Sequence, residues 1–204
     1  MRALFFLLVP LLGGCRPESP TDTKDMPSPL LEAASRGDLQ GLQVLLSQGT
    51  PADQRDACSW TPLMKAALGG HPEAARRLLD AGAAVDATDN GGYTALLLAA
   101  SRNHADLIDL LLARGAGVDH QETTNGWSAL IWAANLGHAE AVAALIDRGA
   151  DKTLRDHKGL SAGDWAALQG HPAIAALLST SRDLEMATGD PNPLKVMGRD
   201  SEQR

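Results

Sequence analysis

Apolar residues recur along the chain in short blocks with a fixed period. The block at 60–71 reads WTPLMKAALGGH, and YTALLLAASRNH (93–104), WSALIWAANLGH (127–138) and LSAGDWAALQGH (160–171) follow it. Their Ala-Ala pairs, together with the pair at 33–34, are 33 or 34 residues apart. This period predicts a stacked repeat protein, because one short unit cannot bury its own apolar surface.

Each unit begins with the start signal of a short helix. Thr61 precedes Pro62, which places a hydroxyl cap before a proline at the first helical position. Ser28 and Pro29 repeat this arrangement. Two further units keep the cap without the proline, at Thr94 and Ser128. The caps therefore predict where the first helix of each unit begins.

A second helix and a loop complete each unit. In the unit that contains Trp60, this helix runs from about His71 to Gly82 and carries an apolar stripe. The stripe residues of three units are Ala75, Leu78 and Leu79, then Ile108, Leu111 and Leu112, then Val142, Leu145 and Ile146. The segment DATDNGG (86–92) favours a tight turn or hairpin.

The turn between the two helices carries its own column of residues. Its members are Gly37, Gly70, Asn103, Gly137 and Gly170. Asn is the residue other than Gly that best tolerates a left-handed backbone conformation. Asn103 therefore indicates that this column needs a positive φ at the end of a helix.

These features closely resemble the ankyrin repeat. The family pattern of Gly-x-Thr-Pro-Leu, Ala-Ala, Gly-His, Leu-Leu and Gly-Ala is matched by GYTALLLAASRNHADLIDLLLARGAGVD (92–119) and its neighbours. Five copies cover about Met26 to Ser179. The resemblance implies an all-α solenoid of helix-turn-helix pairs with hairpin loops, placed here at 28–180.

The chain also departs from this pattern at defined positions. The family often has His after Thr-Pro-Leu, where this chain has Met64, Leu97, Ile131 and Asp164. The last unit lacks the terminal Gly, as a capping repeat does, and the loop 120–126 contains one extra residue.

The resemblance also implies a concave face, formed by the hairpin side and the first helices, that binds a protein partner. Trp60, Tyr93 and Trp127 occupy one repeat position just before the cap and are predicted to anchor that partner with partly exposed rings. Alternatively, these aromatics brace the next hairpin. Trp132 and Trp165, inside first helices, are assigned to the core. Further partner-binding candidates are Arg55, Thr88, Asn90, Arg102, His157 and Lys158.

The first fifteen residues predict where the protein is located in the cell. MRALFFLLVPLLGG (1–14) has one positive charge and an apolar run too short to span a bilayer, as in a signal peptide. Its end resembles a bacterial lipobox, which implies lipidation of Cys15; an ordinary signal peptide with a chance cysteine is the alternative. We expect a lipid-anchored protein that faces the periplasm. Arg16, where inner-membrane lipoproteins often have Asp, slightly favours the outer membrane.

The polar segments on either side of the repeats are expected to be flexible. Residues 15–27 and 181–204 are rich in Pro and in charged or small polar residues and contain few large apolar ones. The first is interpreted as a tether and the second as a loose tail, with a docked tail as the alternative.

The composition narrows the function classes. The chain has 204 residues, 44% hydrophobic but only 3% aromatic, so Ala and Leu must fill the core. Its net charge is −7. Binding nucleic acid through phosphate contacts needs clustered Lys and Arg, so we expect no nucleic-acid partner.

No residue pattern points to catalysis or to a metal. His71, His104, His138 and His171 share one column, but stacked helices lie ~8–10 Å apart, whereas zinc ligands lie ~2 Å from the ion. Each imidazole is therefore expected to bond to backbone in a turn. There is no Ser-His-Asp order and no phosphate loop. We expect no enzyme, cofactor or metal site.

Two alternative functions are considered beside partner binding. An immunity or inhibitor protein would neutralise a toxic envelope-targeting enzyme by placing an acidic stack in a basic cleft. A factor that protects the envelope against oxidative stress is suggested by Cys58, which would be the only free thiol of a lipidated chain. An incidental small residue is the preferred interpretation of Cys58.

Overall fold

The computed structural model describes residues 28–179. The expected signal peptide (1–14), the lipid-attachment site Cys15, the tether (15–27) and the tail (181–204) lie outside the described residues. Within 28–179 the chain forms ten helices and no β-strand. They are α1 (Pro29–Arg36), α2 (Leu39–Ser47), α3 (Pro62–Gly69), α4 (Pro72–Asp80), α5 (Ala95–Ser101), α6 (Ala105–Ala113), α7 (Ala129–Leu136), α8 (Ala139–Asp147), α9 (Ala162–Leu168) and α10 (Pro172–Leu178).

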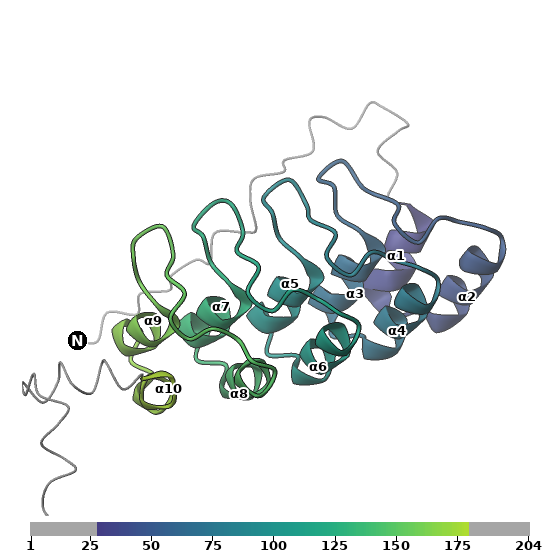
Figure 1. Cartoon of the computed structure of the whole chain (residues 1–204). Helices are drawn as coiled ribbons and strands as arrows, with labels where there is room; N and C mark the ends of the chain where they lie inside the picture. The colour runs from purple at the N-terminus through teal and green to yellow at the C-terminus, as the bar shows by residue number, and fades with distance from the viewer. Residues whose placement is uncertain (1–27, 180–204) are drawn as a thin grey trace, which may run out of the picture.

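The helices pack in consecutive pairs that stack into a solenoid (Figure 1). The odd-numbered helices form one layer and the even-numbered helices a second layer, and each pair is joined by a short turn. Long loops connect one pair to the next and project from the layers on one side (Figure 1). The all-α solenoid predicted from the repeats is therefore confirmed.

Hydroxyl caps start four of the five odd-numbered helices. The side chains of Thr61, Thr94, Ser128 and Ser161 accept hydrogen bonds from the backbone N–H three residues on. Ser28 does not, which corrects the sequence-based expectation. It has φ −53° and ψ 131°, unlike the extended backbone of Thr61, and its hydroxyl donates to the side chain of Gln54 instead.

The core lies between the two layers and is built from small and aliphatic side chains. The Ala-Ala pairs of the inner units are fully buried, so neighbouring helices can approach closely. The stripe residues Ala75, Leu78 and Ile108 are also fully buried. The third stripe positions, at Leu79 and Leu112, are only partly buried. None of the helices in 28–179 is long and apolar enough to cross a bilayer.

The turns between paired helices confirm the predicted left-handed column. Asn103 has φ 60°, and the four glycines of the column have φ between 65° and 80°. A Cβ placed on Gly37 would lie 2.8 Å from the ring of His71, so this turn also needs glycine for the close approach.

The histidine column has the structural role predicted for it in two units. Nε2 of His71 lies 3.0 Å from the carbonyl oxygen of Ser35, and Nε2 of His138 lies 3.2 Å from that of Ser101. His104 and His171 pack instead against the turn glycines Gly70 and Gly137.

Candidate functional site

The four long loops form the candidate site. They span residues 48–61, 81–94, 114–128 and 148–161, and together we call their surface the loop face. Eight of the nine predicted partner-binding residues lie on it. Arg102 does not, because it follows the last turn of α5, at the other end of that helix from the loop 81–94.

A column of carboxylates organises the loop face from inside. Oδ1 of Asp56 accepts the backbone N–H groups of Cys58 and Trp60 at 3.0 and 2.8 Å. Asp89 and Asp156 repeat this pattern with the residues two and four positions further on, at 2.8 to 2.9 Å. Each loop thus closes around an acceptor that satisfies two backbone donors.

In the third loop, 114–128, the acceptor of the backbone N–H groups is a glutamate instead of an aspartate. Thr124 is the extra residue of this loop, and its N–H bonds to Oε2 of Glu122 at 2.6 Å. Oε1 of Glu122 accepts from Asn125 at 2.8 Å and from Trp127 at 3.1 Å. Because the Glu side chain has one more methylene than Asp, it reaches across the enlarged loop. Glu122 is 1% exposed.

Asp156 also joins two consecutive units through two indoles. Its Oδ2 accepts the indole N–H of Trp127 at 3.0 Å and that of Trp165 at 2.9 Å. Burial alone would raise the pKa of Asp156, but the donors from Leu160, Trp165, Lys158 and Trp127 outweigh it and lower the pKa. The buried carboxylate is therefore held in its charged form.

Backbone hydrogen bonds connect each loop to the next. Asn90 N–H donates to Cys58 O at 3.4 Å, Thr123 to Gly91 O at 3.0 Å, and His157 to Asn125 O at 2.9 Å. At the base of the loops, Asp53, Asp86 and Asp119 accept a backbone N–H from the following loop. The loop face is consequently one hydrogen-bonded surface rather than four independent hairpins.

Of the aromatic residues Trp60, Tyr93 and Trp127, Tyr93 has a packing role. Tyr93 is 7% exposed, so the expectation of a partly exposed ring is wrong for this residue. It packs with Leu97 and Trp132. Burial, and then the charges of Glu122 and Asp89, raise the pKa of Tyr93.

Trp60 and Trp127 are partly buried, each against different neighbours. Trp127 makes edge contacts with Trp132 at 5.0 Å and with Trp165 at 5.2 Å between ring centroids. Trp60 is covered by the ammonium group of Lys65, 4.3 Å from its ring centroid. Trp132 and Trp165 are buried, as predicted.

The polar candidates differ in how strongly they are engaged. Arg55 is exposed but donates to Thr88 O at 2.7 Å, so both residues belong to a cross-link between loops. Asn90 is exposed and accepts from the Ser59 hydroxyl at 2.8 Å. The side chains of His157 and Lys158 are exposed near the last unit, and Lys158 lies 5.1 Å from the ring centroid of Trp165.

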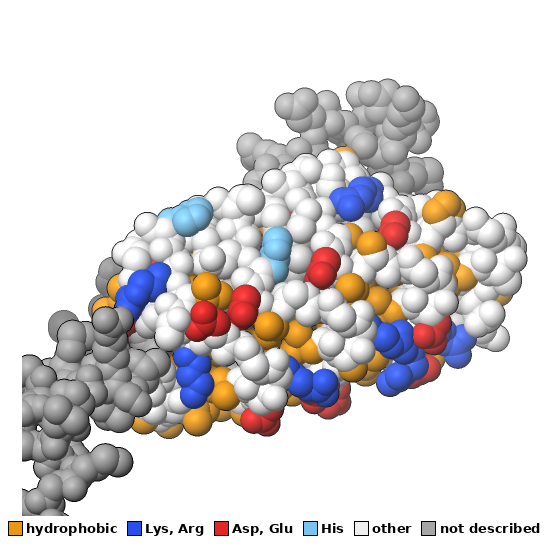
Figure 2. All heavy atoms as spheres, viewed as in Figure 1, with side chains coloured by type: hydrophobic (Ala, Val, Ile, Leu, Met, Phe, Trp, Pro, Cys, Tyr) orange, Lys and Arg blue, Asp and Glu red, His pale blue; other side chains and the backbone are white. Residues whose placement is uncertain are grey.

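The exposed charges at the tips of the loops are positive, at Arg55, Arg155 and Lys158, whereas Asp86, Asp119 and Asp151 are exposed nearer the helices. The buried carboxylates of the loop face are occupied by backbone and indole donors, whereas no carboxylate pairs with Arg55 or Lys158 in the described part of the chain. Arg155, beside them, pairs with Asp164 at 3.2 Å. Figure 2 shows His and Lys or Arg side chains toward the outer edge of the loops and Asp or Glu side chains nearer the helices.

Sequence reasoning missed the carboxylate column. Its signal was present, since Asp56, Asp89, Glu122 and Asp156 recur with the repeat period. Charged side chains are mostly solvent-exposed, whereas Glu122 and Asp156 are buried. The pattern alone does not reveal that these oxygens face inward.

On the sequence alone Cys58 is a candidate free thiol, and the structure differs on this point. The described residues contain no free cysteine, so the interpretation of Cys58 as a lone thiol is wrong.

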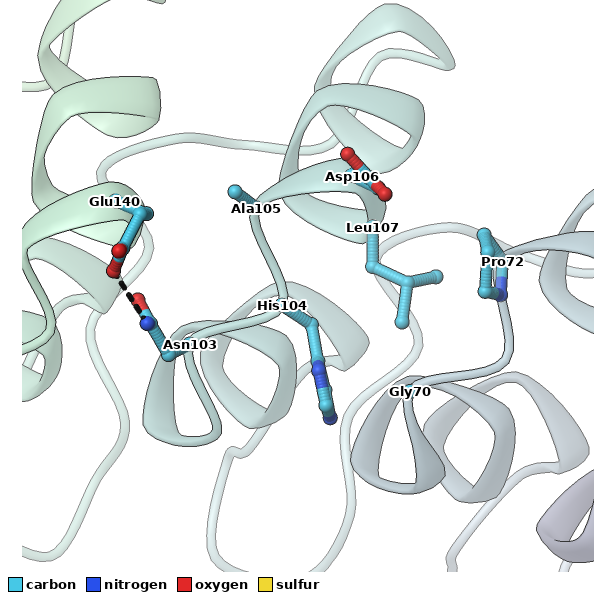
Figure 3. Close-up of a pocket in the computed structure, with 8 residues that line it drawn as sticks. All are labelled: Gly70, Pro72, Asn103, His104, Ala105, Asp106, Leu107 and Glu140. Carbon is cyan, nitrogen blue, oxygen red and sulfur yellow. Dashed lines mark hydrogen bonds between the residues drawn. The ribbon is translucent and has the colours of Figure 1, made fainter.

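A shallow recess of about 290 Å³ lies beside the turn between α5 and α6 (Figure 3). Asn103 donates to Glu140 at 2.6 Å across its rim, and this hydrogen bond is the main cause that lowers the pKa of Glu140. Oδ1 of Asn103 accepts the N–H of Ala141 at 3.1 Å. The polar groups of the recess therefore tie two units together. Within 28–179, no three His, Cys, Asp or Glu side chains converge as metal ligands.

Comparison with known proteins agrees with this geometry. A family model described as ankyrin repeats (3 copies) matches residues 30–122 and 98–188. A search of curated proteins found no match.

Proposed function

The chain belongs to the ankyrin-repeat family, and on this premise we propose that it is a lipid-anchored protein that faces the periplasm and binds a protein partner on its loop face. Ankyrin repeats are protein-protein interaction modules and typically non-enzymatic scaffolds. The proposal extends the repeat assignment to all five helix pairs, since each has the same arrangement of two helices, Ala-Ala pair and turn.

The observation that carries the proposal is the hydrogen-bonded loop face. A surface that is ordered before binding loses little conformational entropy when a partner docks. Here the loops are joined through Thr123, His157 and the Asp156 carboxylate, while the side chains of Asn90, His157 and Lys158 remain exposed. The rigid part holds the backbone, and the exposed part is available for recognition.

The charge at the tips of the loops favours an acidic partner. Although the whole chain carries a net charge of −7, the acids at the loop tips bond to backbone or indole donors, and the exposed cations Arg55 and Lys158 lack carboxylate partners in the described region. Complementary charge mainly raises association rate and specificity. The inhibitor alternative needs an acidic surface for a basic cleft, which the tips of the loops do not supply. No observation now favours the oxidative-stress alternative.

Differential capture tests partner binding. The chain with His157→Glu and Lys158→Glu is compared with the wild type as bait in an envelope extract after cross-linking. We expect a protein that the wild type captures and the double variant does not. The control is Arg76→Glu on α4, whose exposed side chain pairs only with Glu73 in the described region. Equal loss with the control variant, or no loss with the double variant, would remove the loop face as the binding surface.

The anchor is supported by the sequence alone and is tested separately. Cys15→Ser should abolish incorporation of labelled palmitate and move the protein from the membrane to the soluble fraction. Protease added to spheroplasts should degrade the wild-type repeats. Palmitate labelling that persists in Cys15→Ser would refute the anchor without affecting the partner-binding proposal.

A further inference from the structure

The C-terminal end of the stack presents an uncovered repeat interface. In the four preceding units, the second residue of the Ala-Ala pair is fully buried, and these residues are Ala34, Ala67, Ala100 and Ala134. The equivalent Ala167 in α9 is exposed. The same repeat position changes from buried to exposed where no further helix pair follows in the described chain.

The turn beside Ala167 shows the same difference, and apolar side chains are exposed next to it. At Gly70 and Gly137, the histidine ring of the following unit comes within 2.5 and 2.6 Å of an added Cβ, but nothing lies within 4 Å at Gly170. Leu168 is 66% exposed and Leu177 is 49% exposed. We call Ala167, Leu168, Gly170 and Leu177 the end face. Such an apolar end needs a cap with a polar outer side.

We propose that residues 180–188 of the same chain cover the end face and cap the solenoid. The described chain reaches Ser179 beside this surface, because Leu178 Cβ lies 3.5 Å from a Cβ placed on Gly163, at the start of α9. Lys152 donates to Leu177 O at 3.1 Å and holds the end of α10 in place. The ankyrin match also continues beyond α10, to residue 188.

The length and pattern of this segment fit the end face. Nine extended residues reach about 30 Å, whereas the seven residues of α9 extend only about 10 Å. The sequence DLEM (183–186) alternates charged and apolar residues. An extended segment with this pattern directs Leu184 and Met186 to one side and Asp183 and Glu185 to the other. The apolar side chains then meet the end face and the carboxylates face water.

Trypsin cleavage of the full-length protein tests the cap with an internal reference. Arg182 and Arg199 are each followed by Asp, so their peptide bonds are chemically matched. We expect cleavage after Arg182 to be at least about tenfold slower than after Arg199, because cleavage requires the segment to detach. Ala167→Arg should remove this difference, and the control Ala139→Arg, at an exposed alanine of α8, should preserve it.

A second variant approaches the same contact from the tail. Leu184→Asp with Met186→Asp leaves every helix unchanged and should also remove the protection of Arg182. Equal cleavage at both sites in the wild type would overturn the proposal. Protection that survives Ala167→Arg and the double variant would place the segment elsewhere. Protection that disappears on dilution, together with a dimer in solution, would assign the end face to a second copy.

Discussion

Trp127 donates its indole N–H to the Asp156 carboxylate at 3.0 Å, although the two residues belong to consecutive helical units. Trp165, which follows Asp156 in the next helix, donates to the same oxygen at 2.9 Å. The buried carboxylate thus connects the loop before α7 to the loop before α9. The stability of the C-terminal half of the stack is expected to depend on this connection.

Trp127→Ala should destabilise the fold. The substitution removes two aromatic edge contacts and the bond to Asp156, and truncating a packed Trp costs ~3–5 kcal/mol in a full core. Because Trp127 is partly exposed, we expect about 2–4 kcal/mol in a urea melt. Trp60→Ala is the control and should cost less, since its ring lies under Lys65 and takes part in no aromatic pair in the described region. A Trp127→Ala protein that melts like the wild type but loses its partner would restore the anchor interpretation.

Asp156→Asn should be more disruptive than its similar size suggests. The amide presents an N–H₂ group where the carboxylate accepted donors, so at least one indole or backbone N–H loses its acceptor. A hydrogen bond to a charged group contributes roughly 1.5–3 kcal/mol, and we expect a loss of about 3 kcal/mol. The free energy of unfolding from denaturant titration measures it. Asp151→Asn is an exposed control in the same loop, and a cost equal to that of Asp156→Asn would contradict the argument.

Acid should weaken the solenoid through two carboxylates. The pKa of Asp156 is lowered, as is that of Asp164, where burial opposes but hydrogen bonds from Ser161 and the charge of Arg155 prevail. A pKa below its unfolded value of about 3.9 gives stability that is present above that value and lost as the pH falls through the folded pKa. We expect the unfolding midpoint to decrease below about pH 4. Asp156→Asn should flatten this decrease, and an unchanged slope would exclude Asp156 as a contributor.

Glu122 and Thr124 should compensate each other. Glu122→Asp gives a side chain that is too short for the enlarged loop. Deleting Thr124 shortens the loop and leaves the Glu122 side chain too long for it. Each change alone should therefore lower the stability of the fold. The combined change recreates the Asp loops of the other units and should recover at least the wild-type midpoint.

This double change has a further consequence at Trp132. Its indole N–H is buried without an acceptor in the described chain, whereas the equivalent Trp165 bonds to Asp156. Oε2 of Glu122 accepts the backbone N–H of Thr124. Removing Thr124 frees a carboxylate oxygen at position 122, which can then accept the indole N–H of Trp132. Additive destabilisation in a double-mutant cycle would disprove the coupling.

Asn103→Ala should cost stability at an otherwise permissive turn. Ala at φ 60° is strained by roughly 1–2 kcal/mol, and the change also removes the acceptor of the Ala141 N–H. Asn103→Gly relieves the strain but not the lost hydrogen bond, so its melting temperature should fall between those of the wild type and Asn103→Ala. Because both variants lose the bond to Ala141, the opposite order of the two would show that backbone strain at this position is unimportant.

Local chemistry made most of the fold predictable from the sequence. Thr61 with Pro62 marks a helix start by itself, and Asn103 in a glycine column indicates a left-handed turn, because both depend on neighbours within one helical turn. The Ala-Ala period then required stacking, since no unit could bury its own surface. Ser28 shows the limit of this reasoning, because the same cap and proline pair adopts another backbone conformation at the first unit.

Only the tertiary structure decided what each loop side chain meets. Tyr93 and Trp127 occupy one column, yet Tyr93 is buried beside Trp132 while Trp127 bonds to Asp156 in the next loop. Spacing determines which residues are equivalent, but the direction and neighbours of a side chain depend on a unit about 33 residues away. The sequence therefore could not predict that Asp156 accepts two indole N–H groups, or that Glu122 compensates for the extra residue Thr124. Both depend on how the loops pack against each other.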